Sequence, residues 1–151
     1  MAAEIRPLIP AVAFRFDVTF GGLSAGFSKV SGLREESDVI EYREGTDDTK
    51  HRKFPGLRTF PNIVCERGLG ASSILVKLRK TVLECKMKRD SMVIKVMSCT
   101  GNTMRTITAE AAWIVALEIG DLDANSSEVA IEIAEFAHEG VYKNVMFSEN
   151  D

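Results

Sequence analysis

The chain has 151 residues, of which 45% are hydrophobic and 27% charged, a composition typical of folded globular proteins and not of disordered ones. No run approaches the roughly 18 apolar residues of a membrane span, and the N-terminal segment lacks a signal-peptide pattern, so we expect no membrane insertion by this chain. The length suits one hydrophobic core, and we interpret residues 1–151 as a single domain.

The net charge of −3 hides an uneven distribution. Residues 1–49 carry 5 Lys/Arg against 9 Asp/Glu, residues 50–105 carry 13 against 3, and residues 106–151 carry 1 against 10. This pattern is compatible with a nucleic-acid patch, with complementary contacts between copies of the chain, or with charges mixed on one surface. The three cysteines lie far apart and indicate neither a zinc site nor a disulfide framework.

The chain begins with a predicted β-hairpin. Residues 12–20 alternate strictly between apolar and polar side chains, which is typical of a half-buried strand. Gly21 and Gly22 supply the turn, because glycine adopts positive φ without steric cost. Residues 25–30 are predicted as the returning strand.

A long polar segment follows this hairpin. Residues 37–43 favour a strand, and residues 44–60 then change to Gly, Thr, Asp, Lys, His and Arg with one Pro-Gly pair. This composition predicts a long hairpin loop at about 44–60, and loops of this length inside a domain are usually functional or disordered. Residues 62–67 are predicted as a further short strand.

One segment has helical periodicity. Ile74, Leu75, Leu78, Val82 and Cys85 share one face, which predicts a helix over about residues 72–86. Ser72 or Ser73 can cap its start, and basic residues suit its C-terminal end. Strands are predicted at 92–98, 104–108, 112–119 and 128–137, with a turn at 100–102 and a loop after 119. The predicted fold class is therefore mainly β and antiparallel, with one helix.

The sequence contains few residue patterns that indicate a catalytic, metal-binding or nucleotide-binding site. His51 and His138 have no partners at metal-ligand spacing, and no nucleotide-binding or nucleophile motif occurs. The carboxylates are more simply explained as a solvated acidic face than as an acid/base pair. The basic residues 50–53 lack the interleaved aromatics of a single-strand binder. We therefore expect no catalytic residue, no cofactor-binding site and no metal site, and no enzymatic activity.

Several motifs in order resemble the tail-tube protein family shared by contractile phages and phage-like bacterial injection systems. They are residues 16–22 (FDVTFGG), 26–33 (GFSKVSGL), 39–45 (VIEYREG), 53–57 (KFPGL), 62–68 (NIVCERG), 112–113 (AW), 121–123 (DLD), 128–132 (EVAIE) and 137–140 (AHEG). Each motif by itself is weak evidence for the family, but the order and spacing of the motifs together are specific. Two departures are the aromatic-poor helix and Ile114, where relatives often have proline after the tryptophan.

The resemblance implies a β-barrel or sandwich of the tail-tube type with a flanking helix. It implies a structural protein whose homo-hexameric rings stack into a hollow tube, with sheath, baseplate and spike proteins as partners. The lumen would carry cargo, either toxin protein or DNA. The protein would be made in the bacterial cytoplasm and become part of a phage tail or of an injection particle, including one released from the cell.

The resemblance also suggests roles for segments. The strands at 12–20, 25–30, 92–98 and 112–119 are candidates for the barrel and its subunit seams, and the helix would cover its outside. The loop at 44–60 is the candidate ring-stacking contact. Its candidate residues are Gly45, Lys50, Arg52, Lys53, Pro55 and Gly56, with Gly45, Pro55 and Gly56 setting bends and the basic side chains meeting carboxylates of the next ring.

Two alternatives stay open at this point. One is a tube subunit of a type VI secretion system. The other is a monomeric nucleic-acid- or ligand-binding β-barrel that uses the basic middle of the chain.

Overall fold

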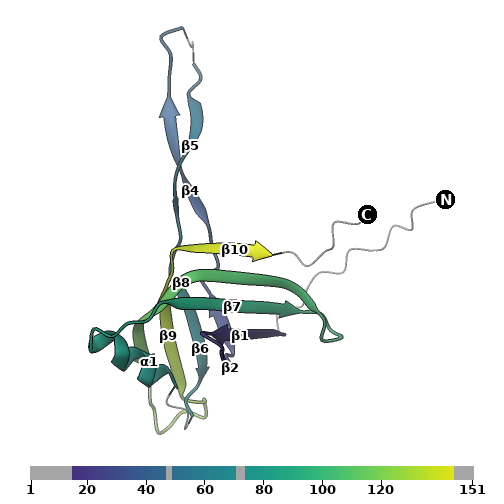
Figure 1. The fold of residues 1–151 in the computed structure, drawn as a ribbon, viewed down its shortest axis with the longest axis vertical. Coiled ribbons are helices and arrows are strands. Elements are labelled where there is room, and N and C mark those ends of the chain that lie inside the picture. Colours follow the sequence, from purple (N-terminus) through teal and green to yellow (C-terminus); the bar gives the residue numbers. More distant parts are fainter. Residues whose placement is uncertain (1–14, 47–48, 71–73, 145–151) are drawn as a thin grey trace, which may run out of the picture.

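The computed structural model describes residues 15–46, 49–70 and 74–144, and within these ranges the chain forms ten strands and one helix. The strands are β1 (Phe16–Phe20), β2 (Leu23–Ala25), β3 (Lys29–Ser31), β4 (Glu36–Tyr42), β5 (Arg52–Thr59), β6 (Ile63–Gly68), β7 (Asp90–Met97), β8 (Thr103–Ile119), β9 (Ile131–Ala137) and β10 (Gly140–Asn144). The helix α1 spans Ile74–Leu83. Figure 1 shows a sheeted body from which the β4–β5 ribbon projects.

The body is one antiparallel sheet folded into two layers. Its order is β2-β1-β7-β8-β9-β6-β3, and β10 also pairs with β8. We call β2, β1, β7, the first half of β8 and β10 sheet A, and the second half of β8 with β9, β6 and β3 sheet B. β10 continues the line of β9 along β8, because Ala137 lies opposite Trp113 and Gly140 lies opposite Glu110.

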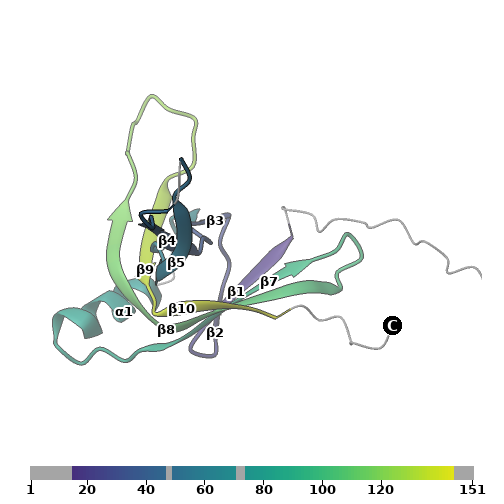
Figure 2. The same ribbon diagram turned by 90° about the horizontal axis from the view of Figure 1, so that it is seen from above.

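β8 joins the two layers by bending (Figure 2). Ala111 lies in the middle of the strand with a φ of 49°, a left-handed conformation that residues with a Cβ rarely adopt. The register against β7 shifts at the same place, since Asp90 pairs with Ala112 and Met92 with Ala109. Such a bulge bends a strand and re-aims it. One 17-residue strand therefore serves both sheets, where the sequence predicted two strands at 104–108 and 112–119.

The hydrophobic core lies between the layers and under α1. Its buried members include Val18, Ile63, Cys65, Leu75, Met92, Ile94, Ile107, Ala109, Ala112, Ile114, Ala134 and Phe136. The ring of Phe20 in sheet A lies 5.4 Å from the ring of Phe136 in sheet B. Leu75 carries the apolar side of α1 into this core. The alternating strands predicted from the sequence thus bury one face each, as half-buried strands do.

The helix is shorter than its predicted span of 72–86, and its proposed serine caps lie outside the described residues. It ends in a Schellman motif, in which Lys86 N donates to Thr81 O at 2.9 Å and Cys85 N donates to Val82 O at 3.1 Å. Cys85 occupies the left-handed position of that motif, with a φ of 57°. Its side chain is exposed. The prediction that Cys85 lies on the apolar helical face was wrong, because the helix unwinds before reaching it.

The N-terminal hairpin forms with shorter arms than predicted. Residues 12–14 of its first predicted strand lie outside the described part of the chain. Gly21 and Gly22 both have positive φ and form a two-residue turn, so that β2 pairs with β1. The predicted returning strand at 25–30 is instead split. After Ala25 the chain crosses to sheet B, where β3 pairs with β6.

The remaining elements follow the prediction with three differences. β9 begins at Ile131, three residues later than expected, because residues 120–130 form a wider loop. The strand β10 was missed, because only its pairing with β8 identifies it. The predicted long loop at 44–60 is a loop only to residue 51, and β5 then pairs with β4. Among the described residues, no helix has the length and apolarity needed to cross a membrane.

Candidate assembly surfaces

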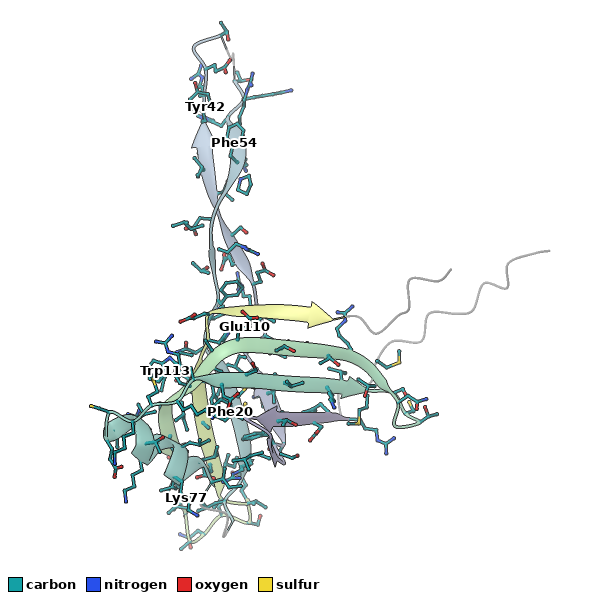
Figure 3. The ribbon with its side chains drawn as sticks, in the orientation of Figure 1. Phe20, Tyr42, Phe54, Lys77, Glu110 and Trp113 are labelled. Carbon is teal, nitrogen blue, oxygen red and sulfur yellow. The ribbon has the colours of Figure 1, made fainter. Side chains whose placement is uncertain are left out.

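The β4–β5 ribbon extends away from both sheets (Figures 1 and 3). Every residue of β4 is exposed, and in β5 all but Gly56 are exposed. Ile40, Tyr42 and Phe54 share one face of the ribbon, where the rings of Tyr42 and Phe54 lie 6.4 Å apart. Two-stranded ribbons are marginally stable by themselves in water. The ribbon therefore presents apolar side chains that the described part of its own subunit leaves exposed.

The other face of the ribbon is also apolar in part. Val39 pairs with Pro55, and Leu57 is 80% exposed. Contiguous apolar surface on a soluble protein usually marks a site of interaction. The sequence did not predict this surface, because the composition of residues 44–60 indicates a polar loop. The available signal was the grouping of Val39, Ile40 and Tyr42 in one segment and of Phe54 and Leu57 in the next.

The predicted stacking residues divide between the tip and β5. Gly45 and Lys50 lie in the tip, and Asp47 and Asp48 between them lie outside the described residues. Arg52 lies 3.6 Å from Glu44 across the tip. Lys53 is exposed beside it and pairs with Glu41 across the strands.

Pro55 and Gly56, expected to set bends in a loop, lie inside β5. Gly56 lies where the register shifts between Ser37 and Val39. A Cβ on Gly56 would stand 3.1 Å from the Cβ and carbonyl oxygen of Asp38. A side chain at this position would therefore be in tight contact with β4, which would have to shift by a few tenths of an ångström.

The base of the ribbon is tied to the corner between β9 and β10. His138 Nε2 donates to the carbonyl oxygen of Pro61 at 3.0 Å, and its ring lies 5.8 Å from the ring of Phe60. Arg89, which follows α1, forms an ion pair with Glu139 at the same corner. The contacts of His138 connect the segment that leaves the ribbon to the corner between β9 and β10.

Sheet A ends on both sides in a strand that has one partner. Within the described residues, β10 pairs only with β8, and the three-residue β2 pairs only with β1. An edge strand exposes N–H and C=O groups that template pairing with another chain. The β10 edge faces the side of the ribbon, and the β2 edge faces the opposite end (Figure 1). The two edges are therefore positioned for a head-to-tail contact.

The outer face of sheet A is polar. Pairing aligns Thr19, Val93 and Thr108 in one row, and Asp17, Lys95 and Thr106 in the next. The opposite face of the same strands is the core. A sheet with hydroxyl groups and opposite charges on its free face is suited to contact water.

The helix presents a basic outer surface. Lys77, labelled in Figure 3, and Lys80 are exposed, and the chain beyond the helix adds the exposed Lys86 and Lys88. Leu83 on the same helix is 67% exposed. The basic middle seen in the sequence is therefore partly concentrated around α1.

The described residues contain little that resembles a reaction centre. Within them, no group of three or more His, Cys, Asp or Glu side chains is arranged to hold a metal ion. Burial raises the pKa of Cys65 to about 12, so its thiol is held in the neutral, unreactive form. Arg67 and Glu132 form a buried ion pair across β6 and β9, at 2.7 Å, inside sheet B. These three side chains are buried within the body.

Comparison with known proteins gives a consistent result. A family model described as T4-like virus tail tube protein gp19 matches residues 12–142. A chain in the cryo-EM structure of the anti-feeding prophage cap, described as the tube terminating cap, is 25% identical with a TM-score of 0.86, over 95% of this chain and 97% of that one. A chain in the 6-fold symmetrised anti-feeding prophage baseplate is 26% identical with a TM-score of 0.80, over 91% and 97%.

A more distant structural likeness extends to a protein of lower sequence identity. Hcp1 from Flavobacterium johnsoniae has a TM-score of 0.54 at 16% identity, over 86% of this chain and 94% of that one, which shows a shared fold alone. Among curated proteins, none matches. The predicted fold class and the family resemblance are both confirmed. The chain belongs to the T4-like virus tail tube protein family.

Proposed function

We propose that six copies of this chain close into a ring, and that the rings stack into a hollow tube that conducts cargo in a contractile particle. The observation that carries the proposal is the pair of one-sided edges of sheet A, at β10 and β2, on opposite sides of the subunit. Pairing β10 of one copy with the β1–β2 edge of the next removes both edges. A heterologous contact of this kind closes into a ring when its rotation fits.

A six-membered ring is supported by likeness. The similar baseplate chain belongs to a structure described as 6-fold symmetrised. In such a ring the polar outer face of sheet A is the candidate wall of the channel, because the opposite face is the core. A wall of hydroxyl groups and opposite charges suits the passage of a hydrophilic cargo, either toxin protein or DNA.

The remaining partners follow from the exposed surfaces. The basic outer side of α1 is the candidate contact for a sheath, and the ends of the tube would meet a baseplate with its spike and a cap. The similar chains come from an anti-feeding prophage baseplate and a tube terminating cap. We propose that the chain is made in the bacterial cytoplasm and acts within a phage tail or an injection particle.

The decisive experiment is the mass and shape of the purified protein. Light scattering coupled to size-exclusion chromatography should give about six times the chain mass of 16.6 kDa, and negative-stain microscopy should reveal rings and tubes. A protein that stays at single-chain mass at high concentration, and that binds DNA in a salt-dependent way, would overturn the proposal in favour of a monomeric nucleic-acid binder.

The ring-stacking residues have their own test. Replacing Lys50, Arg52 and Lys53 together with glutamate should leave single rings intact and stop tubes from growing, because the tip would then repel carboxylates of the next ring. Tubes of normal length from this variant would remove the tip from the stacking role.

A further inference from the structure

The ribbon meets the body at a short segment between β5 and β6. Phe60 and Pro61 lead out of β5, and Asn62 Nδ2 then donates to Glu135 Oε1 of β9 at 2.7 Å. The other arm of the ribbon leaves the body at the same place, because Gly32 lies so close that a Cβ there would clash with the carbonyl oxygen of Asn62. The contacts of this segment therefore decide the direction in which the ribbon projects (Figure 1).

His138, in the corner between β9 and β10, holds this segment. Its Nε2 lies 3.0 Å from the carbonyl oxygen of Pro61, and its imidazole lies 5.8 Å from the ring of Phe60. A carbonyl oxygen only accepts hydrogen bonds, so Nε2 must carry the proton and Nδ1 of the neutral imidazole is an acceptor. The first residues beyond the ribbon are thus fixed to the body by the neutral form of one histidine.

The second nitrogen of this imidazole is buried without a partner. Nδ1 of His138 has no hydrogen-bond partner within the described part of the chain. A proton on Nδ1 would create a charged imidazolium whose second N–H has no acceptor. Burying an unpaired charge costs far more than burying a neutral polar group. The arrangement around Pro61 therefore favours the neutral imidazole over the charged one.

The charged side chains on the elements around His138 do not offset this cost. Those in ion pairs are Glu139 with Arg89, Arg58 of β5 with Glu35 at 3.4 Å, and Arg34 with Glu36 of β4 at 3.1 Å. The carboxylate of Glu135 accepts from Asn62, and Glu110 of β8 is exposed. The carboxylate next to His138 in the chain is thus already compensated by an arginine.

We propose that His138 is a pH-sensitive latch, which fixes the direction of the ribbon while the imidazole is neutral and releases the ribbon when it is protonated. The latched state binds one proton fewer than the released state, so acid favours release. Imidazole takes up its proton near pH 6.5, about two units above the carboxylates, so the ion pairs beside the latch stay charged through this change. The chain's other histidine, His51, is exposed near the tip of the ribbon and is not part of the latch.

The test measures the direction of the ribbon in the full chain. One spin label is attached at the tip through Thr46→Cys and the other to Cys99 in the turn after β7, and Cys85→Ser removes the other exposed thiol. Pulsed electron paramagnetic resonance at unassembled concentrations then gives the distances between the labels. We expect one narrow distance at about pH 7.5 and an additional broad distribution at about pH 5.5. The ratio of released to latched subunits should rise by up to about ten-fold per pH unit, because one linked proton sets this limit.

The matched variants change the two histidines of the chain in the same way. His138→Gln can still donate to Pro61 and takes up no proton, so its distances should be the same at both pH values. His51→Gln should release its ribbon in acid as the labelled parent does. The latch is overturned if the parent keeps its narrow distance in acid, or if His138→Gln broadens in acid as the parent does. His138→Phe, which keeps a flat ring beside Phe60 and does not titrate, replaces a glutamine variant that fails to fold.

Tube growth is a separate readout, and it rests on the proposed function. A released ribbon no longer holds its tip in place for stacking, so tubes should grow at about pH 7.5 and stop at single rings at about pH 5.5, whereas His138→Gln tubes should grow at both. Equal tube growth at both values, with the labels reporting release, would overturn the effect of the latch on stacking. If no tubes form at either pH, the stacking proposal fails and the spin labels still decide the latch.

Discussion

The body and the ribbon of this subunit differ in how far their side chains are buried. In the body, apolar side chains are buried between two sheets, and even the charged pair of Arg67 and Glu132 is enclosed. In the ribbon, strands of similar length leave nearly every side chain exposed, including Tyr42 and Phe54. Strands of the body bury alternate residues, whereas the strands of the ribbon show no alternation of burial. The body is stable through contacts within one chain, whereas the described part of that chain leaves the side chains of the ribbon exposed.

This difference predicts that stability and assembly respond to different residues. A change in the body should alter the free energy of unfolding of the subunit. It should affect assembly only through this change in stability. A change in the ribbon should leave the subunit stable and alter assembly directly. The predictions below test that separation, and the stability measurements are made at concentrations where the subunit is not assembled, since assembly itself stabilises a fold.

The largest effect should come from comparing two phenylalanines. Phe136→Ala removes a fully buried ring from the core and should cost about 4 kcal/mol of unfolding free energy. Phe54→Ala removes a half-exposed ring from the ribbon and should change the same quantity by less than about 0.5 kcal/mol. Urea denaturation of both variants measures these changes in the free energy of unfolding. Similar losses at the two sites would mean that the ribbon belongs to the cooperative core of the subunit.

The second prediction concerns the buried ion pair. Glu132→Gln keeps the shape of the side chain and removes the negative charge beside the Arg67 guanidinium, which should cost about 3 kcal/mol, because a buried charge loses its compensation. Glu128→Gln, on the exposed loop between β8 and β9, is the matched control and should stay within about 0.5 kcal/mol. Equal unfolding midpoints for the two variants would show that the pair contributes no net stability.

A smaller effect, and of opposite sign, is expected at the end of α1. Cys85 holds a left-handed conformation that glycine adopts without steric cost. Cys85→Gly should therefore raise the unfolding free energy by about 1 kcal/mol and the melting temperature by about 3 °C. Cys99→Ser controls for loss of an exposed thiol. A lower melting temperature for Cys85→Gly would show that the cysteine side chain makes a contact worth more than the backbone strain.

The smallest perturbation uses the thiols as reporters and changes no residue. Because burial raises the pKa of Cys65 to about 12, this thiol stays protonated at pH 8, and only the thiolate reacts. Cys85 and Cys99 are exposed. At pH 8 we expect two thiols to react quickly with a disulfide reagent and the third roughly 100-fold or more slowly, with all three reacting in denaturant. Three equally fast thiols in the native protein would indicate that the body opens readily.

Much of the fold was predictable from local patterns. The alternation at residues 16–20 and the glycine pair after it determine a hairpin, and the spacing of Ile74, Leu75 and Leu78 determines a helix. The ordered motifs indicated the family. These features depend on near neighbours in the chain, for which side-chain periodicity and glycine conformation are sufficient causes.

The candidate assembly surfaces were predictable only in part. The charged residues around Lys50 predict a stacking contact at the tip of the ribbon, which stays a prediction, and the apolar face at Tyr42 and Phe54 was not predicted. Apolar residues in a strand pattern normally indicate burial in the core, and sequence does not distinguish a strand that packs on its own subunit from one that projects.

What the sequence determined by itself is therefore the class of the elements and their order, since these follow from propensity, periodicity and turn chemistry. Only the tertiary structure decided that one strand bends at Ala111 to serve two sheets, that residues 25–30 divide between β2 and β3, and that β4 and β5 leave the body. Each of these depends on pairing between residues far apart in the chain, and such pairing is selected by the packing of the whole core.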